Sequence, residues 1–177
     1  MNNIAILLER IGRVLQNDAH THGLKPTQWE ALRYLGRANR FSRSPSAVTA
    51  YLGMTKGTVS QTLAALERKG LIEKSSDPTD KRNIHINLTE AGGELLQEDP
   101  VRQFVQVQDT VSAELEAGLE KLLLDTLEKR GGKAFGACKT CKYFQVEHTD
   151  FPEHGCGLLK VALSSDDADR ICAEHIH

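Results

Sequence analysis

The residues whose chemistry is most apparent are the four cysteines, Cys138, Cys141, Cys156 and Cys172, which follow the spacing C-x2-C-x14-C-x15-C. Two thiolates separated by two residues can bind one metal centre from a single turn, and four soft sulfur ligands suit zinc or an iron–sulfur cluster. Structural disulfides are rare in the cytosol, where we expect this chain, so the clustering of all four cysteines favours a metal centre. A thiol-based redox switch without metal and inert thiols remain as alternatives.

The identity of the metal depends on how the cysteines are paired. Zinc sites usually show two close cysteine pairs, whereas this chain has one pair and two single cysteines. The sequence around the cysteines resembles the small cluster-binding subunits of some glycyl-radical enzymes, which are themselves similar to high-potential iron–sulfur proteins. The resemblance lies in CKTCKYF and in the later Gly-Cys and Ile-Cys. That resemblance implies a [4Fe–4S] cluster, with zinc as the alternative. Four histidines could replace a cysteine ligand, although each is more simply a surface residue: His148, His154, His175 and His177.

A second group of functional side chains lies on a helix predicted from Thr55 to Lys69. Thr55 is its expected N-cap. Its first exposed turns carry Lys56, Thr58, Ser60 and Gln61. Such polar side chains can reach base edges in DNA, and the free amides of the helix N-terminus favour a phosphate. On a single isolated helix these side chains would be interpreted as merely solvated, so the interpretation depends on the neighbouring elements.

Those neighbours predict a winged helix-turn-helix at about residues 44–89. Ser44-Pro45 is an N-cap followed by proline at the first helical position, and Gly53 ends that helix before Thr55 begins the next one. Residues 71–74 and 84–88 then alternate like the two strands of a hairpin. The hairpin carries Lys81 and Arg82 near its tip, and this basic wing favours a contact with DNA over a purely solvated surface.

Further helices are expected on both sides of the winged helix. An apolar stripe from Ile4 to Leu15 predicts a first helix, and Thr27 is a possible N-cap for a second one, whose Trp29 we assign to the core. A helix that starts at Thr89 should be kinked or split at Pro100. A last helix over 112–129 carries leucines on one side, and Gly131-Gly132 follows it as a hinge.

The run LGMTKGTVSQTLAALERKGLIEKSSDPTDKRNIHINLTEAG resembles the MarR family of winged-helix regulators. The matching features are Gly-x-x-x-Gly-Thr-Val-Ser, Lys-Gly-Leu-Ile, the wing pair Asp80 and Arg82, and Leu-Thr-x-x-Gly. The resemblance covers about residues 2–130 and is most specific over 52–92. It implies an obligate homodimer formed by the first and last helices, a palindromic operator, a wing aspartate that orients the wing arginine, and a small effector pocket.

Charge is distributed unevenly along the chain, although the net charge is only −2. Lys and Arg minus Asp and Glu is 5 minus 3 over residues 1–39, 8 minus 5 over 40–90 and 9 minus 16 over 91–177. A basic middle segment can therefore face double-stranded DNA despite the acidic total. The apolar runs are too short for a membrane span, so we expect a cytoplasmic protein without membrane contact.

Taken together, the patterns predict a mainly α fold with a small β-hairpin wing. Residues 1–130 form the winged-helix and helical dimerisation domain, and 131–177 form a small Cys-rich metal-binding module. The predicted function is transcriptional regulation with a metal centre that senses redox state or iron, or only stabilises the tail. No Gly-rich phosphate loop, His-Glu-x-x-His or nucleophile elbow occurs, so we do not expect an enzyme. A protein–protein adaptor is the remaining alternative.

Overall fold

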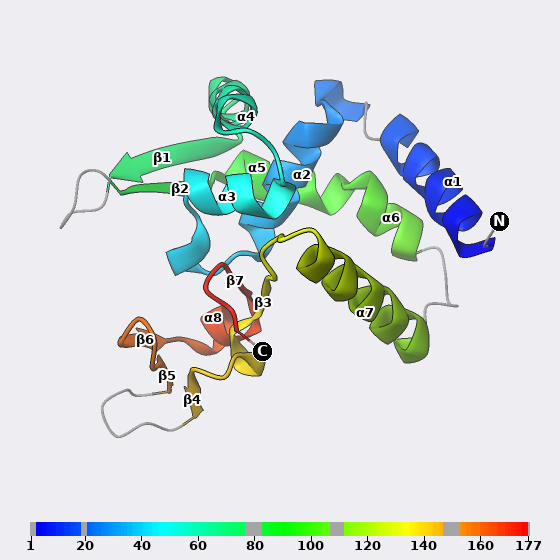
Figure 1. Ribbon diagram of the computed structural model, residues 1–177. Helices are drawn as coiled ribbons and strands as arrows, with labels where there is room; N and C mark the ends of the chain where they lie inside the picture. Colours follow the sequence, from blue (N-terminus) through cyan, green and yellow to red (C-terminus); the bar gives the residue numbers. More distant parts are fainter. Residues whose placement is uncertain (1–2, 19–20, 77–82, 107–111, 147–152, 177) are drawn as a thin grey trace.

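The computed structural model describes residues 3–18, 21–76, 83–106, 112–146 and 153–176 (Figure 1). Three parts are visible: a winged helix with its hairpin extended to one side, the helices α1, α6 and α7 at the opposite side, and a small tail below the winged helix. Among the described residues, no helix is both long and apolar enough to cross a membrane. The elements up to the last long helix are α1 Asn3–Asp18, η1 Thr21–Gly23, α2 Pro26–Arg37, η2 Arg40–Ser42, α3 Pro45–Leu52, α4 Lys56–Arg68, β1 Ile72–Ser76, β2 Ile84–Leu88, α5 Glu90–Leu95, η3 Leu96–Glu98, α6 Pro100–Gln106 and α7 Ala113–Lys129.

The helix-turn-helix has the capping interactions that the sequence predicts. The Ser44 hydroxyl accepts a hydrogen bond from the Ala47 amide at 3.2 Å, and Pro45 occupies the first turn of α3. Gly53 ends α3 with a φ of 62°, a left-handed conformation that favours glycine. The Thr55 hydroxyl then accepts from the Thr58 amide at 3.2 Å and starts α4.

The hairpin and the core complete the winged helix. Strands β1 and β2 pair antiparallel, with Ile72 opposite Leu88 and Ser76 opposite Ile84. Their inward-facing Ile72 and Ile86 join a core built from the buried faces of α2, α3 and α4. Trp29 is fully buried in that core, which confirms its predicted packing role. The strands confirm the predicted wing hairpin, whereas the wing residues 77–82 lie outside the described residues.

Two of the predicted helix boundaries can be compared with the structure. Thr27 does not cap α2, because the helix already begins at Pro26. The N-cap is Lys25. Its amide donates a hydrogen bond to the Gln28 side chain at 2.9 Å, which is the back-bond of a capping box. The break at Pro100 is confirmed, since a 3-10 turn and Asp99 separate α5 from α6.

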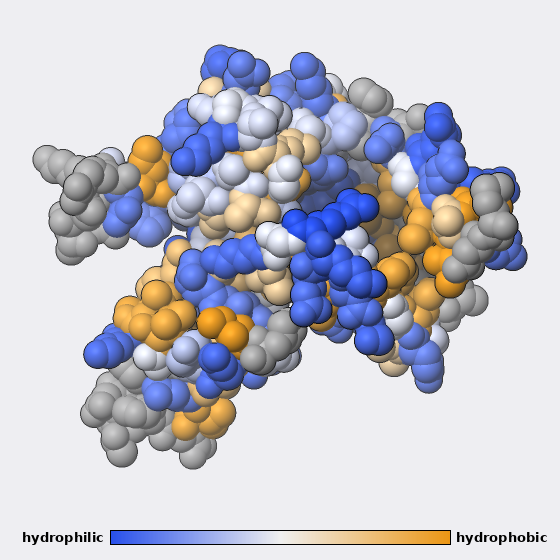
Figure 2. Space-filling model, viewed as in Figure 1, coloured by the Kyte–Doolittle hydropathy of each residue, from blue (hydrophilic) through white to orange (hydrophobic). Residues whose placement is uncertain are grey.

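The helices α1 and α7 carry apolar side chains that the monomer leaves in contact with solvent. Leu7 is 55% exposed on α1, and Leu123 is 58% exposed on α7. Figure 2 shows hydrophobic side chains gathered on the side of the molecule where these two helices lie. Burial of apolar surface is the main source of association energy, so each of these helices carries apolar surface suited to contact with a partner.

The tail consists of short strands and one short helix folded against the winged helix. Strands β4, β5 and β6 form an antiparallel sheet, and β3 pairs antiparallel with β7, which joins the two ends of the tail. Ile171 and Ala173 belong to or pack against the core of the winged helix. The tail elements are β3 Gly136–Ala137, η4 Cys138–Thr140, β4 Phe144–Val146, β5 His154–Cys156, β6 Val161–Leu163, α8 Ser165–Asp169 and β7 Ile171–Cys172.

The two adjacent glycines of α5 give a test of how closely this helix packs on the turn before β1. A Cβ at Gly92 would lie 2.1 Å from the Leu71 carbonyl oxygen, which already accepts a hydrogen bond from the Thr89 amide. A Cβ at Gly93 would meet nothing within 4 Å. We expect Gly92→Ala to lower the free energy of unfolding by about 1–3 kcal/mol, because backbone must move. Gly93→Ala should raise it by about 0.5–1 kcal/mol, because alanine favours a helix interior.

Urea unfolding followed by circular dichroism measures both variants against the parent protein. Opposite signs are the expected outcome, and equal effects of the two substitutions would contradict the close packing of Gly92 on Leu71.

Candidate functional site

The exposed face of α4 carries the polar residues that were predicted to contact DNA. Lys56, Thr58, Ser60 and Gln61 are all exposed, whereas Val59, Leu63 and Leu66 on the other side are buried in the core. Thr55 and Thr58 bond to one another through their hydroxyls at 2.9 Å, which orders the first turn. The helix therefore presents a rigid row of hydrogen-bonding groups and one positive charge to solvent, beginning at its N-terminus.

A groove separates this face from α3 and the wing. It has a volume of about 370 Å³ and is lined by residues that include Thr49, Lys56, Ser60 and Lys74. The Lys74 ammonium is paired with the Glu67 carboxylate at 2.6 Å, so Lys56 is the positive charge of the groove without a described ion-pair partner. The predicted wing residues Asp80, Lys81 and Arg82 lie outside the described residues.

On the other side of α4, a second groove of about 440 Å³ runs toward the start of α2. Its lining includes Thr58 and Gln61 from α4 together with Lys25, Thr27 and Arg68. Lys25 and Arg68 extend the positively charged surface beyond the predicted residues. Neither residue is predicted by a local sequence pattern, because only the packing of α2 on α4 brings the two segments together.

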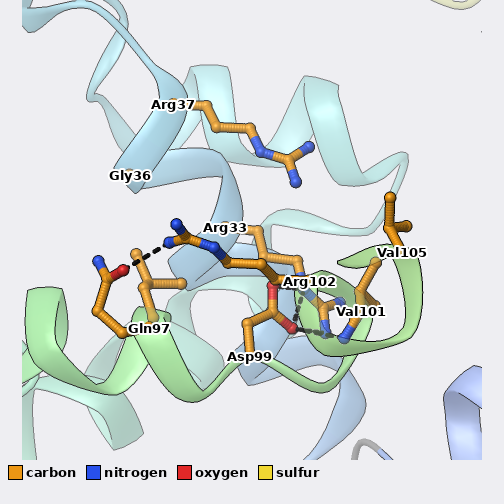
Figure 3. A pocket seen from close by; sticks show the side chains of 9 residues that line it. Arg33, Gly36, Arg37, Gln97, Asp99, Val101, Arg102 and Val105 are labelled. Carbon is orange, nitrogen blue, oxygen red and sulfur yellow. Dashed lines mark hydrogen bonds and ion pairs between the residues drawn. The ribbon is translucent and has the colours of Figure 1, made fainter. Parts of the chain in front are cut away.

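A third cavity, of about 410 Å³, lies between α2, η3 and α6 (Figure 3). Arg33 donates to Asp99 through Nε and Nη2 at 2.8 and 2.7 Å, and Arg102 donates to the Gln97 side chain at 2.6 Å. No dashed line in Figure 3 reaches Arg37. The remaining lining is apolar and comes from Leu96, Val101 and Val105. A cavity with guanidinium groups over apolar walls suits a small molecule with an anionic end.

The tail brings together three of the four cysteines. Cys138 and Cys172 are buried, and with Leu163 they form a small core against which Cys156 and Phe41 pack. We call these residues, with the partly buried Phe144 and Val161, the cysteine core. Cys141 follows at the end of η4, where its amide donates to the Cys138 carbonyl at 3.0 Å. The clustering of the sulfurs is produced by the pairing of β3 with β7, not by neighbouring positions in the chain.

Each of the three clustered sulfurs accepts a hydrogen bond from an N–H group. The Glu174 amide donates to Cys172 Sγ at 3.3 Å and the Leu159 amide to Cys156 Sγ at 3.4 Å. Asn39 Nδ2, which comes from the winged helix, donates to Cys138 Sγ at 3.1 Å. Donors of this kind stabilise negative charge on sulfur, as required for thiolate ligands.

The protonation of the buried pair is unequal. A hydrogen bond from Cys138 is the main reason that the pKa of Cys172 falls to about 6, against the opposing effect of burial. The same hydrogen bond, together with burial, raises the pKa of Cys138 far above its ordinary range. The hydrogen bond between them therefore favours the thiolate at Cys172 over the thiolate at Cys138.

Of the histidines named as possible ligands, His154 is half-buried and His175 is buried, so the prediction of a surface position is wrong for His175. His154 packs on the Phe144 ring at a centroid distance of 5.0 Å, and His175 lies 2.9 Å from the Thr140 hydroxyl. His148 and His177 are outside the described residues. Within the described ranges, no three His, Cys, Asp or Glu side chains converge on one point as ligands of a single ion.

Comparison with known proteins concerns the winged-helix part. A MarR family model, MarR_2, matches residues 22–83. The uncharacterized HTH-type transcriptional regulator YkoM of Bacillus subtilis (strain 168) is 32% identical over 82 residues, which are 45% of this chain and 50% of the relative. The transcriptional repressor MprA of Escherichia coli (strain K12) is 32% identical over 92 residues, 52% of this chain and 50% of that protein. The chain thus spans about half the length of these curated relatives.

Solved structures extend the similarity in fold. The chain resembles Streptococcus pneumoniae FabT, solved in complex with DNA, with a TM-score of 0.54 and 25% identity over 72% of this chain and 94% of that one. The match to the family model ends at residue 83, before the cysteine tail begins.

The Arg33–Asp99 pair allows a test of what holds α6 against α2. The side chains are only 15% and 5% exposed, so Asp99→Ala leaves a largely buried guanidinium without its carboxylate. We expect the free energy of unfolding to fall by about 3 kcal/mol, and Arg33→Met in the same chain to restore most of the loss. Arg102→Ala, at an exposed bond to Gln97, is the matched control and should change it by less than about 1 kcal/mol.

Thermal and urea unfolding of the three proteins measure these values. A double variant as unstable as Asp99→Ala alone would show that the loss does not come from the unpaired guanidinium.

Proposed function

Because residues 22–83 match a MarR family model, we propose that the chain is a transcriptional regulator that binds double-stranded DNA as a homodimer. The observation that supports this most directly is the exposed polar face of α4. Its first turn is capped by Thr55, and four hydrogen-bonding side chains follow on the solvent side. A helix of this kind enters the major groove with its N-terminal residues toward the bases. A DNA-binding role would place the protein in the cytoplasm.

The proposed dimer uses the apolar surfaces of α1 and α7. Leucines on both helices are about half exposed, and they lie on the side away from the wing. Two-fold pairing would bury both surfaces and place two α4 helices on one side of the assembly. Such a dimer matches a palindromic operator, since each half-site is contacted by one helix.

The DNA proposal is tested by substitutions on α4. Gln61→Ala should weaken binding to the operator by about 1–3 kcal/mol and relax the preference for one base pair. Lys56→Ala should weaken binding to all sequences alike, because it removes a phosphate contact. The slope of log affinity against log salt concentration should then decrease by about one. We also expect Arg82→Ala in the wing to cost about 1–3 kcal/mol.

The control is Lys121→Ala, on an exposed residue of α7 that is paired only with Asp125 across one helical turn. Gel-shift titration at fixed and varied salt gives the affinities, and light scattering verifies that each variant remains a dimer. If Lys121→Ala weakens binding as much as Lys56→Ala, or if none of the α4 variants changes it, α4 is not the DNA-binding helix. A wild-type protein that binds partner proteins but no duplex would favour the adaptor alternative.

The cavity between α2 and α6 is proposed as the site of a small-molecule effector. Arg33 and Asp99 neutralise each other, which leaves Arg37 and the rim residue Arg102 for an anionic group. The cavity lies beside α6, which packs on α1, so a ligand there would act at the boundary between the proposed dimer surface and the winged helix.

The cysteine core is proposed to hold a [4Fe–4S] cluster. Its chemistry fits, since soft sulfurs lie in an apolar surround and three of them accept N–H bonds. Such a cluster can exchange an electron, which would let the tail respond to oxidants or to iron supply.

Within this proposal, the residues of the chain have distinct tasks. Cys138, Cys141, Cys156 and Cys172 would be the ligands. The amides of Leu159 and Glu174 hold the orientation of two sulfurs, and the rings of Phe41 and Phe144 keep water from the core. A structural zinc site remains the alternative. The contact of Cys138 with Cys172 also supports a second candidate, a metal-free switch in which these two thiols form a disulfide.

Metal analysis separates these candidates. Anaerobically purified protein should be brown and contain about four irons per chain if it binds the cluster, or be colourless with about one zinc. Cys138→Ser should lose the metal in either case. Lys139→Ala is the matched control, because its exposed side chain pairs with Asp169 and should leave the metal content unchanged. Metal-free protein with four freely alkylated thiols would exclude both metals and leave the disulfide switch.

A further inference from the structure

We infer that the segment between α2 and α3, residues 38–44, couples the cysteine core to the DNA-contacting helices, and that Asn39 is the residue through which it does so. We call this segment the connector. The inference rests on the proposed function, because it takes the cysteines as a chemically changeable site and α4 as the DNA-contacting helix. It assigns Asn39 as a positioning residue and the connector as the path between the two sites.

The tail is bound to the connector by backbone and side-chain contacts along its length. The Asn39 amide donates to the Ile171 carbonyl at 2.9 Å, next to a parallel bridge between Ala38 and Ile171. The Ala173 amide donates to the Ser42 hydroxyl at 2.8 Å. These bonds flank Cys172 on both sides in the chain, so a displacement of this cysteine moves the strand that the connector holds.

Asn39 makes the closest link to a sulfur. Its side chain is 1% exposed, and Nδ2 donates to Cys138 Sγ at 3.1 Å. Its Oδ1 is buried without a hydrogen-bond partner among the described residues. The same side-chain amide also hydrogen-bonds to Cys172, so both buried sulfurs are its partners. A hydrogen bond to sulfur strengthens with the negative charge on the sulfur, so a change in the charge of this pair alters the force that holds Asn39.

The other end of the connector is joined directly to the DNA-contacting elements. Ser44 is the N-cap of α3, the helix that packs on α4. The Arg43 carbonyl accepts a hydrogen bond from the Ile86 amide of β2 at 2.8 Å. Phe41 belongs to both the cysteine core and the connector, and it also lines a groove shared with Ser44 and with Ile84 of the wing. A shift of the connector therefore reaches both the start of α3 and the wing strand within the same protomer.

The chain offers a different route through Gly131-Gly132 to α7. Gly131 has a φ of 64°, and the Gly132 amide donates to the Leu127 carbonyl at 2.8 Å. Near this turn, the tail is fastened by an exposed pair, Lys133 with Glu174 at 3.1 Å. A signal along this route would have to pass through the dimer helices before it reached α4. The two routes predict different effects of Asn39 and Lys133.

Coupling between two sites is reciprocal, and this sets the readout. If oxidation of the cysteine core changes the affinity for DNA by some factor, DNA must change the equilibrium between the oxidised and reduced core by the same factor. A substitution that only destabilised the tail would alter the oxidation equilibrium but would not remove its dependence on DNA.

The experiment compares wild-type protein with Asn39→Leu, and with Lys133→Ala as the control. The duplex is one selected by the anaerobic wild-type protein from a random-sequence library. Affinity is measured for anaerobic protein and for protein treated with ferricyanide. In metal-bound protein, one ferricyanide ion accepts one electron from the thiolate-bound group. In metal-free protein, two ferricyanide ions accept one electron each while Cys138 and Cys172 join in a disulfide and any thiol proton that the pair still holds passes to water.

We expect wild type and Lys133→Ala to show the same change in affinity between the two preparations, about tenfold. In Asn39→Leu the two affinities should agree within about twofold. For a bound cluster, the reduction potential of wild type should move by about 59 mV when the duplex is added, the value for a tenfold change in a one-electron couple. The potential of Asn39→Leu should not depend on the duplex. Circular dichroism and light scattering verify that the variants are folded dimers.

If Asn39→Leu does not fold, Ser42→Ala takes its place, since it removes the bond to Ala173 from the same connector. The inference is overturned if Asn39→Leu shows the same ratio of anaerobic to oxidised DNA affinity as wild type, or if Lys133→Ala loses that ratio. Either result leaves the proposed function intact. Wild-type protein whose DNA affinity is the same before and after oxidation also overturns the inference. Metal-free wild type overturns the metal proposal alone, because the affinity ratios of the thiol and disulfide forms still decide the role of Asn39.

Discussion

The burial of α2 on several sides at once is the constraint on which the rest of the molecule depends. Trp29, Leu32 and Leu35 supply the core on which α3, α4 and the wing strands pack. Arg33, on a different side, holds α6 through Asp99. The Tyr34 hydroxyl donates to the Ser42 carbonyl at 2.7 Å and fixes the connector. Because one helix contacts the core of the winged helix, the residue before α6, the connector and the tail, a shift of any of these parts acts on it.

The winged helix was predictable to within a few residues because its boundaries are set locally. Ser44, Thr55 and Ser112 each cap a helix with their own hydroxyl, and Pro100 divides two helices by its own geometry. The start of α2 was mispredicted because Pro26 begins the helix and Lys25 is its N-cap, with the Gln28 side chain accepting from the Lys25 amide. Where the residue that sets a helix boundary lies within four positions of that boundary, the sequence pattern predicted the right element and in most cases the right boundary.

The sites were predictable in residue type but not in their surroundings. The polar face of α4 follows from helical periodicity, and the cysteines from their spacing. Asn39, by contrast, is 99 positions from Cys138 in the chain, and nothing in its local sequence indicates that it donates a hydrogen bond to a cysteine sulfur. Lys25 and Arg68 likewise meet across α2 and α4. Contacts of this kind depend on the packing of distant segments, which single-sequence patterns do not contain.

The acidic tail and the basic DNA-contacting half are compatible because the tail neutralises its carboxylates within its own interface. Asp167 is buried, and its Oδ2 accepts from the Ser164 hydroxyl at 2.9 Å and pairs with Arg40 at 2.7 Å. Arg170 donates to Asp166 and lowers its pKa, and the same guanidinium donates to the Gly36 carbonyl of α2. Both arginines thus join the tail to the winged helix while shielding its negative charge from a phosphate surface. The arginines that hold the tail and its cysteine core against the winged helix therefore also neutralise two of the tail's carboxylates.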